Sequence, residues 1–217
     1  LKSDINKKGR ILIALILNQY RQDIANKHGI NLKPVILFKA QKTIQQSEEN
    51  KKEFHEIIDN LNKKDIEDIK QRTDLPILKK VFSFYEKEKI PFEILIQKLR
   101  LNFEENKCIS MNDDTSIEKN QLLINSLEEK NNQIRAIFTV QKLNEGWDVL
   151  NLFDIVRLYE GQAGGGGYKG KVSPSTLSEA QLIGRGARYY PFKIKDREDD
   201  KFKRKYDKDI NNDLRVL

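Results

Sequence analysis

Residues 33–39 read Lys-Pro-Val-Ile-Leu-Phe-Lys. Four consecutive apolar residues after a proline are typical of a strand that is buried on both faces, as in a parallel sheet. A helix with a wide apolar face is predicted before this strand, from Lys8 to Lys27, and Gly29 is expected to end it. A long charged helix, residues 41–72, is predicted after the strand, with one narrow apolar stripe. The stretch therefore predicts a core strand between helices.

The chain alternates between strands and helices further on. Strands are predicted at residues 107–111, 134–140 and 152–159, and a helix at 116–130 with Ser116 as its N-cap. Strands separated by helices favour a parallel sheet, so the predicted fold class is α/β.

Residues 73–106 interrupt this alternation and are predicted to be a helical insertion on a common core. Two helices are expected there, because Pro76 and Pro91 lie where a helix would begin and proline is tolerated in the first turn. No function is assigned to this segment.

Composition and charge narrow the class of protein. The 217 residues carry 40 Lys and Arg against 33 Asp and Glu, a net charge of +7. A basic excess favours an anionic partner, most often nucleic acid, although a Lys-rich soluble surface would look the same. One cysteine excludes an intramolecular disulfide and a multi-cysteine zinc site, and Cys108 is predicted to be an inert core thiol. Two histidines are too few and too scattered for a metal centre, so no metal ligand is predicted.

The apolar runs and the start of the chain indicate whether the protein carries a membrane span or a signal peptide. The longest apolar run, residues 11–17, is far shorter than the roughly 20 residues of a membrane span, and no signal peptide is apparent. We therefore expect a cytoplasmic protein without a membrane partner. The chain begins with Leu1 rather than Met, which predicts a fragment of a longer protein.

Four consecutive glycines occur at residues 164–167. A phosphate-binding loop needs a following Lys-Ser or Lys-Thr at a helix start, and none is present. Residues 161–177 are therefore predicted to form a flexible Gly-rich loop.

Residues 181–188 read Gln-Leu-Ile-Gly-Arg-Gly-Ala-Arg, within a helix predicted to begin at Ser178. At about 100° per residue, one face of that helix carries four of these positions: Gln181, Gly184, Arg185 and Arg188. Neighbouring guanidinium groups suit a phosphate between them, as in a phosphoryl-transfer site. The alternative is a surface helix whose arginines pair with carboxylates, and the helix pattern alone leaves the two comparable.

Residues 139–148 read Thr-Val-Gln-Lys-Leu-Asn-Glu-Gly-Trp-Asp and follow a predicted strand. They should lie at the carboxyl edge of the sheet, where α/β domains bind ligands. Gly146 permits close backbone approach, Asp148 can accept from a ribose hydroxyl or an arginine, and Thr139 can donate to a backbone phosphate. Alone, this stretch could also be an ordinary loop around a buried Trp147.

Taken together, these two stretches resemble motifs V and VI of superfamily two helicases, and residues 35–38 with Lys39 and Gln41 resemble motif IV. The longer strings 33–39, 143–148 and 179–189 are most similar to the Res subunit of type III restriction endonucleases, a DEAD/DEAH-like translocase. The resemblance covers nearly the whole chain from Lys8 onward.

The resemblance implies that residues 1–217 form one RecA-like domain, the C-terminal half of a helicase motor with a P-loop NTPase-type fold. ATP would bind between two such domains. The implied catalytic residues, with the arginines as arginine fingers, are Arg185, Arg188 and Gln181. The implied ATP-binding residues are Gly146, Asp148, Gly184, Arg185 and Arg188. The implied nucleic-acid-binding residues are Thr139, Lys39, Gln41 and Lys142.

The departures from the family pattern matter equally. No G-x-x-x-x-G-K-[ST] and no Mg²⁺-binding acidic box occur, and both belong to the first RecA-like domain. ATP and Mg²⁺ would therefore be held mainly by that missing domain, and no nuclease pattern is present. The resemblance implies three partners: double-stranded DNA, the N-terminal RecA-like domain and the methylation (Mod) subunit. Inside the full-length enzyme the chain would serve a DNA-cleaving translocase, whereas the fragment alone should be inactive. The alternatives are a repair or RNA helicase and a non-catalytic nucleic-acid-binding module.

Overall fold

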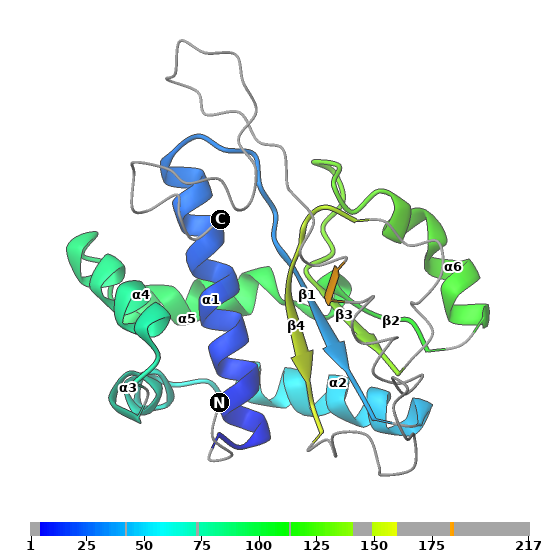
Figure 1. Cartoon of the computed structure of the whole chain (residues 1–217), viewed down its shortest axis with the longest axis horizontal. Helices are drawn as coiled ribbons and strands as arrows, with labels where there is room; N and C mark the ends of the chain where they lie inside the picture. The colour runs from blue at the N-terminus through cyan, green and yellow to red at the C-terminus, as the bar shows by residue number, and fades with distance from the viewer. Residues whose placement is uncertain are drawn as a thin grey trace, which may run out of the picture.

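The computed structural model describes residues 5–41, 43–72, 74–112, 114–140, 149–159 and 183–184. The elements follow in the order α1 (Lys7–Lys27), β1 (Val35–Lys39), α2 (Ile44–Asp59), α3 (Lys63–Arg72), α4 (Pro76–Lys87), α5 (Phe92–Asn102), a 3-10 turn (Glu105–Lys107), β2 (Cys108–Ser110), α6 (Asp114–Asn125), β3 (Ala136–Thr139) and β4 (Leu152–Arg157). The described strands form one four-stranded sheet in the order β2-β3-β1-β4, and every pairing is parallel (Figure 1). The predicted α/β class is confirmed, and the arrangement is that of a RecA-like domain.

Strand β1 lies inside the sheet, between β3 and β4. All five of its residues are buried, which confirms the prediction of a strand covered on both faces. Its side chains alternate between two cores, because successive residues of a strand point to opposite faces. Ile36 and Phe38 pack into one core, and Val35 and Leu37 into the other.

Helices cover the two faces unequally. The larger core joins the sheet to α1, α2, α3, α4 and α5, and the smaller core joins it to α6 (Figure 1). In the larger core the Phe38 and Phe138 rings stack at 5.0 Å, and Phe54 of α2 meets them at 5.1 Å and 5.2 Å. Each such pair adds about 0.5–1.5 kcal/mol beyond the burial of its area, so this cluster fixes α2 against the sheet.

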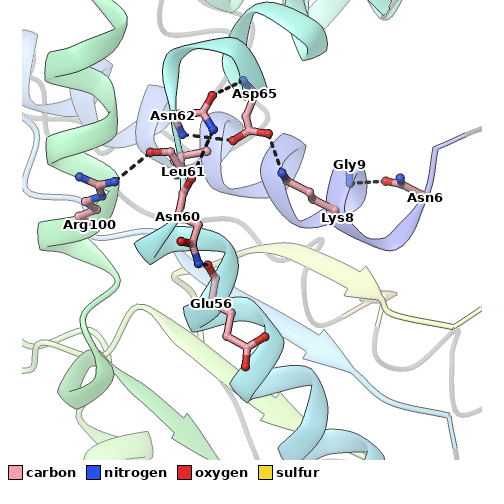
Figure 2. Close-up of polar contacts among 9 residues, drawn as sticks. All are labelled: Asn6, Lys8, Gly9, Glu56, Asn60, Leu61, Asn62, Asp65 and Arg100. Atoms are coloured by element: carbon pink, nitrogen blue, oxygen red, sulfur yellow. Dashed lines mark hydrogen bonds and ion pairs between the residues drawn. The ribbon is translucent and has the colours of Figure 1, made fainter.

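The single helix predicted over residues 41–72 is wrong, because the chain breaks between α2 and α3 (Figure 2). Asn60 ends α2, and its side chain donates to the carbonyl of Glu56 at 2.8 Å. Asn62 and Asp65 then cap each other's backbone at the start of α3: the Asp65 N–H donates to Asn62 Oδ1 at 3.3 Å, and the Asn62 N–H donates to Asp65 Oδ2 at 3.2 Å. Asparagine favours such local bonds over helix continuation, which explains the break.

Arg100 of α5 stabilises the same corner from a distant part of the chain (Figure 2). Its guanidinium donates to three carbonyl oxygens, those of Ile58 at 3.3 Å, Asp59 at 3.0 Å and Leu61 at 2.9 Å. The last carbonyls of a helix have no partner within the helix, and this side chain supplies one.

Helices α4 and α5 confirm the two predicted helices of residues 75–106. Pro76 is the first residue of α4, and Pro91 is the N-cap of α5. Buried residues of both helices, such as Tyr85 and Leu99, belong to the main core rather than to a separate one. That residues 73–106 are an insertion stays a prediction.

The remaining predictions concern helix α6, the Cys108 thiol and the Gly-rich stretch. Helix α6 spans Asp114–Asn125 rather than the predicted 116–130. The prediction of Ser116 as N-cap is therefore wrong, and Ser116 lies in the first turn. Cys108 is 3% exposed, and burial raises the pKa of its thiol to about 12, which confirms a core thiol. The Gly-rich loop at 161–177 and the helix start at Ser178 lie outside the described residues. No helix in the described part of the chain is long and apolar enough to cross a membrane.

Candidate functional site

The carboxyl ends of the four described strands meet at one edge of the sheet, the lower edge in Figure 1. Backbone hydrogen bonds continue the pairing past the strand ends: Ala40 N–H donates to Thr139 O at 2.8 Å, and Leu158 N–H donates to Lys39 O at 3.0 Å. Lys39 and Thr139 are direct register partners. The structure therefore brings the motif IV-like strand and the start of the motif V-like stretch side by side, about 100 positions apart in sequence.

Thr139 is the innermost of the predicted nucleic-acid residues. It is only 3% exposed, and its hydroxyl donates to the backbone oxygen of Met111 at 2.8 Å. This bond ties the end of β3 to the residue that follows β2. A phosphate contact by this hydroxyl would require it to leave the Met111 carbonyl, and the DNA role stays a prediction.

Lys39 and Gln41 differ in access. Lys39 is 7% exposed and stands in register with Thr139 on one side and Arg157 on the other. Gln41 lies two residues past the strand and is exposed. Of the predicted nucleic-acid residues that the structure describes, Gln41 is the one open to a ligand as the chain stands.

A polar contact that the sequence reasoning missed joins α2 to the same edge. Glu48 accepts hydrogen bonds from Ser110 Oγ at 3.2 Å and from Asn112 Nδ2 at 2.6 Å. Asn112 is 5% exposed and adjoins Met111, the residue that accepts from Thr139. These residues form a fixed polar layer beneath the edge. The position of Asn112 directly after a predicted strand was the only available signal, because no motif includes these residues.

Most of the predicted nucleotide site lies outside the described residues, namely Gln181, Arg185, Arg188, Gly146, Asp148 and Lys142. Gly184 is described, and it is helical and exposed. A Cβ placed on Gly184 would meet no described atom within 4 Å, so the backbone there is open to close approach. In the described ranges no three His, Cys, Asp or Glu side chains gather as a metal site.

A second charged cluster lies toward the amino ends of the strands. Arg135, 5% exposed, donates to Pro34 O at 3.1 Å and to Asn18 Oδ1 at 2.7 Å. Asn18 in turn donates to Asp154 at 2.9 Å, and Arg21 pairs with Asp154 at 2.6 Å. Burial lowers the pKa of Arg135 to about 10, and the group stays charged at neutral pH. Every member is bonded to another, so this cluster holds α1 on the sheet and leaves no group free for a ligand.

Half-buried Lys33 extends this cluster. Its ammonium donates to Asn132, through the backbone oxygen and, at 3.2 Å, through Oδ1. Burial, and secondly the charge of Arg135, lower the pKa of Lys33 to about 8.

Comparison with known proteins gives one extended match. The chain is 39% identical over 194 residues to the probable type III restriction-modification enzyme HindVIP Res subunit of Haemophilus influenzae. The alignment covers 78% of this chain and 37% of that subunit, so the chain spans well under half of its relative's length. The identity supports a Res-like relationship.

Two further matches each cover only a short part of the chain. The HI_1054_N family, described as an N-terminal region, matches residues 175–217. An uncharacterized protein of Haemophilus influenzae is 51% identical over 43 residues, which are 20% of this chain and 9% of that protein. No solved structure matches the chain.

Proposed function

We propose that the chain is the second RecA-like domain of an ATP-dependent DNA translocase, the Res subunit of a type III restriction–modification system that cleaves DNA. The extended identity to a Res subunit carries the proposal. The sheet supports it, because β1 with its motif IV-like residues lies beside β3, from which the motif V-like residues continue. A repair or RNA helicase would share these motifs, but the similarity to a Res subunit favours a restriction enzyme over these alternatives.

ATP and Mg²⁺ are held, in this proposal, mainly by a first RecA-like domain elsewhere in the full-length protein. Arg185 and Arg188 reach the triphosphate from this chain as arginine fingers, and Gln181 contacts the γ-phosphate. The open backbone at Gly184 suits such an approach, since no described atom crowds it. Gly146 and Asp148 lie near the ribose. The arginines bind tightly only when the two domains close, which couples hydrolysis to movement.

Double-stranded DNA runs along the carboxyl edge of the sheet, where Gln41 is exposed and Lys39, Thr139 and Lys142 are near in sequence or register. The methylation subunit is the partner that recognises the DNA sequence to be cleaved. This chain alone supplies half of an ATPase site and hydrolyses ATP negligibly.

The test is DNA-stimulated ATP hydrolysis by the full-length parent, wild type against Arg188→Ala. Loss of an arginine finger lowers turnover by about 10³-fold or more, with DNA binding preserved. Arg188→Lys should rescue little, because an ammonium lacks the planar fork of a guanidinium. Lys119→Ala, an exposed cation on α6, serves as the matched control and should change nothing. An unchanged rate of ATP hydrolysis in Arg188→Ala would refute the proposed motor role and favour a non-catalytic nucleic-acid-binding module.

A further inference from the structure

A polar cavity of about 220 Å³ opens at the carboxyl ends of β1 and β4. Three segments wall it: the start of α1 with Lys7, the first turns of α2 with Gln46, Glu49 and Asn50, and the strand exits with Gln41 and Tyr159. Its volume is below the roughly 300–1,000 Å³ of pockets that enclose a drug-sized ligand. The cavity therefore suits one small group rather than a whole nucleotide.

Asn50 is the residue of this cavity whose side chain is available to bind a ligand. The residue is 6% exposed and lines the cavity, and its side-chain amide makes no hydrogen bond to another described residue. Neither atom of the amide is a fully buried, unsatisfied group, so the amide is accessible from the open cavity. A ligand that brings both a donor and an acceptor would satisfy the amide.

Among the described residues that line the cavity, the one cation, Lys7, is already paired, so an anion would find no free positive charge there. Lys7 forms an ion pair with Glu53, and Glu49 accepts from Gln45 at 2.8 Å. A phosphate would lie beside the Glu49 carboxylate without a free cation opposite it, which disfavours an anion. The groups left for a ligand are the amides of Asn50 and Gln41, which are neutral.

We infer that this cavity binds a single nucleobase, whose hydrogen-bonding edge is read by Asn50 and Gln41. A carboxamide matches the adjacent donor and acceptor of a base edge, and Leu158 and Tyr159 add apolar wall for the ring. The inference rests on the proposed function, which brings two sources of bases to this edge: an unstacked base of the DNA and the adenine of ATP.

The experiment measures base preference in the full-length parent. One arm compares the affinity of a single-stranded oligonucleotide with that of the same oligonucleotide carrying abasic positions. The other compares ATP with ribose triphosphate, which lacks the base. Asn50→Ala should reduce the base preference about tenfold in one arm, which identifies the source, and leave the binding of the baseless ligand unchanged.

Two further variants keep the result interpretable. Gln41→Ala, at an exposed position, should reduce the same preference by a smaller factor. Asn125→Ala, an exposed asparagine at the end of α6, is the matched control and should have no effect. If both Asn50→Ala and Gln41→Ala keep the wild-type preference in both arms while hydrolysis stays DNA-stimulated, the base site is refuted and the motor stands. Loss of DNA-stimulated hydrolysis in Arg188→Ala tests the motor separately.

Discussion

Removing the hydroxyl of Thr139 by one substitution distinguishes a structural role of this group from a role in DNA binding. Thr139→Val keeps the shape of the side chain and removes its only donor. The bond to Met111 O is 2.8 Å long, and Thr139 and Met111 are 3% and 1% exposed, so water cannot readily replace it. Leaving a buried carbonyl without its donor costs about 1–3 kcal/mol. We expect the free energy of unfolding to fall by that amount.

Urea unfolding of the chain, followed by circular dichroism, gives this free energy from the midpoint and slope of the transition. Thr139→Ser is the matched control, because it keeps the hydroxyl and loses one buried methyl, which costs about 0.8 kcal/mol. The DNA affinity of the full-length parent is measured for the same variants. If Thr139→Val leaves stability within about 0.5 kcal/mol of wild type and weakens DNA binding tenfold, the buried anchor is refuted and the hydroxyl contacts DNA.

Two more predictions concern titratable groups. The pKa of Lys33 is lowered from 10.5 to about 8, so between these pH values the unfolded chain binds more protons and stability should rise with pH. Lys33→Met should flatten that rise in thermal unfolding scans from pH 7.5 to 10.5, and an equally steep rise in the variant would contradict the assignment. Cys108, with its thiol pKa raised to about 12, should resist iodoacetamide at pH 8 in the folded chain and react once urea unfolds it, as mass spectrometry can show; full labelling of the folded chain would refute its burial.

The sequence allowed the core of the fold to be predicted where the cause was local. Four consecutive apolar residues predict a strand covered on both faces, and every residue of β1 is buried. The break between α2 and α3 was missed because two effects combine there. Asn60 and Asn62 cap the helix ends locally, and Arg100, about 40 residues away, satisfies the carbonyls exposed by the break. A periodic pattern does not reveal a partner that arrives through tertiary folding.

The candidate site shows the same division. That Lys39 and Thr139 meet follows from both lying at the carboxyl ends of parallel strands. That both are buried does not follow from sequence, because burial depends on what α2 and the end of β2 place over them. The Glu48–Asn112 contact and the cavity around Asn50 arise the same way, from side chains that only the packing of α2 brings together.

The distribution of charge within the sheet bears on how such a domain could transmit force. The buried ionic cluster of Arg135, Asn18 and Asp154 ties α1 to β3 and β4 toward the amino ends of the strands. Breaking a buried ionic cluster of this kind costs about 3–5 kcal/mol, so α1 and the sheet should move as one body. At the carboxyl edge the Thr139 hydroxyl bonds the Met111 carbonyl and Glu48 bonds Asn112, while the cavity around Asn50 opens past the ends of β1 and β4. A body anchored at one edge, with the exposed Gln41 at the other, would move as a whole when a ligand contacts that edge rather than deform locally.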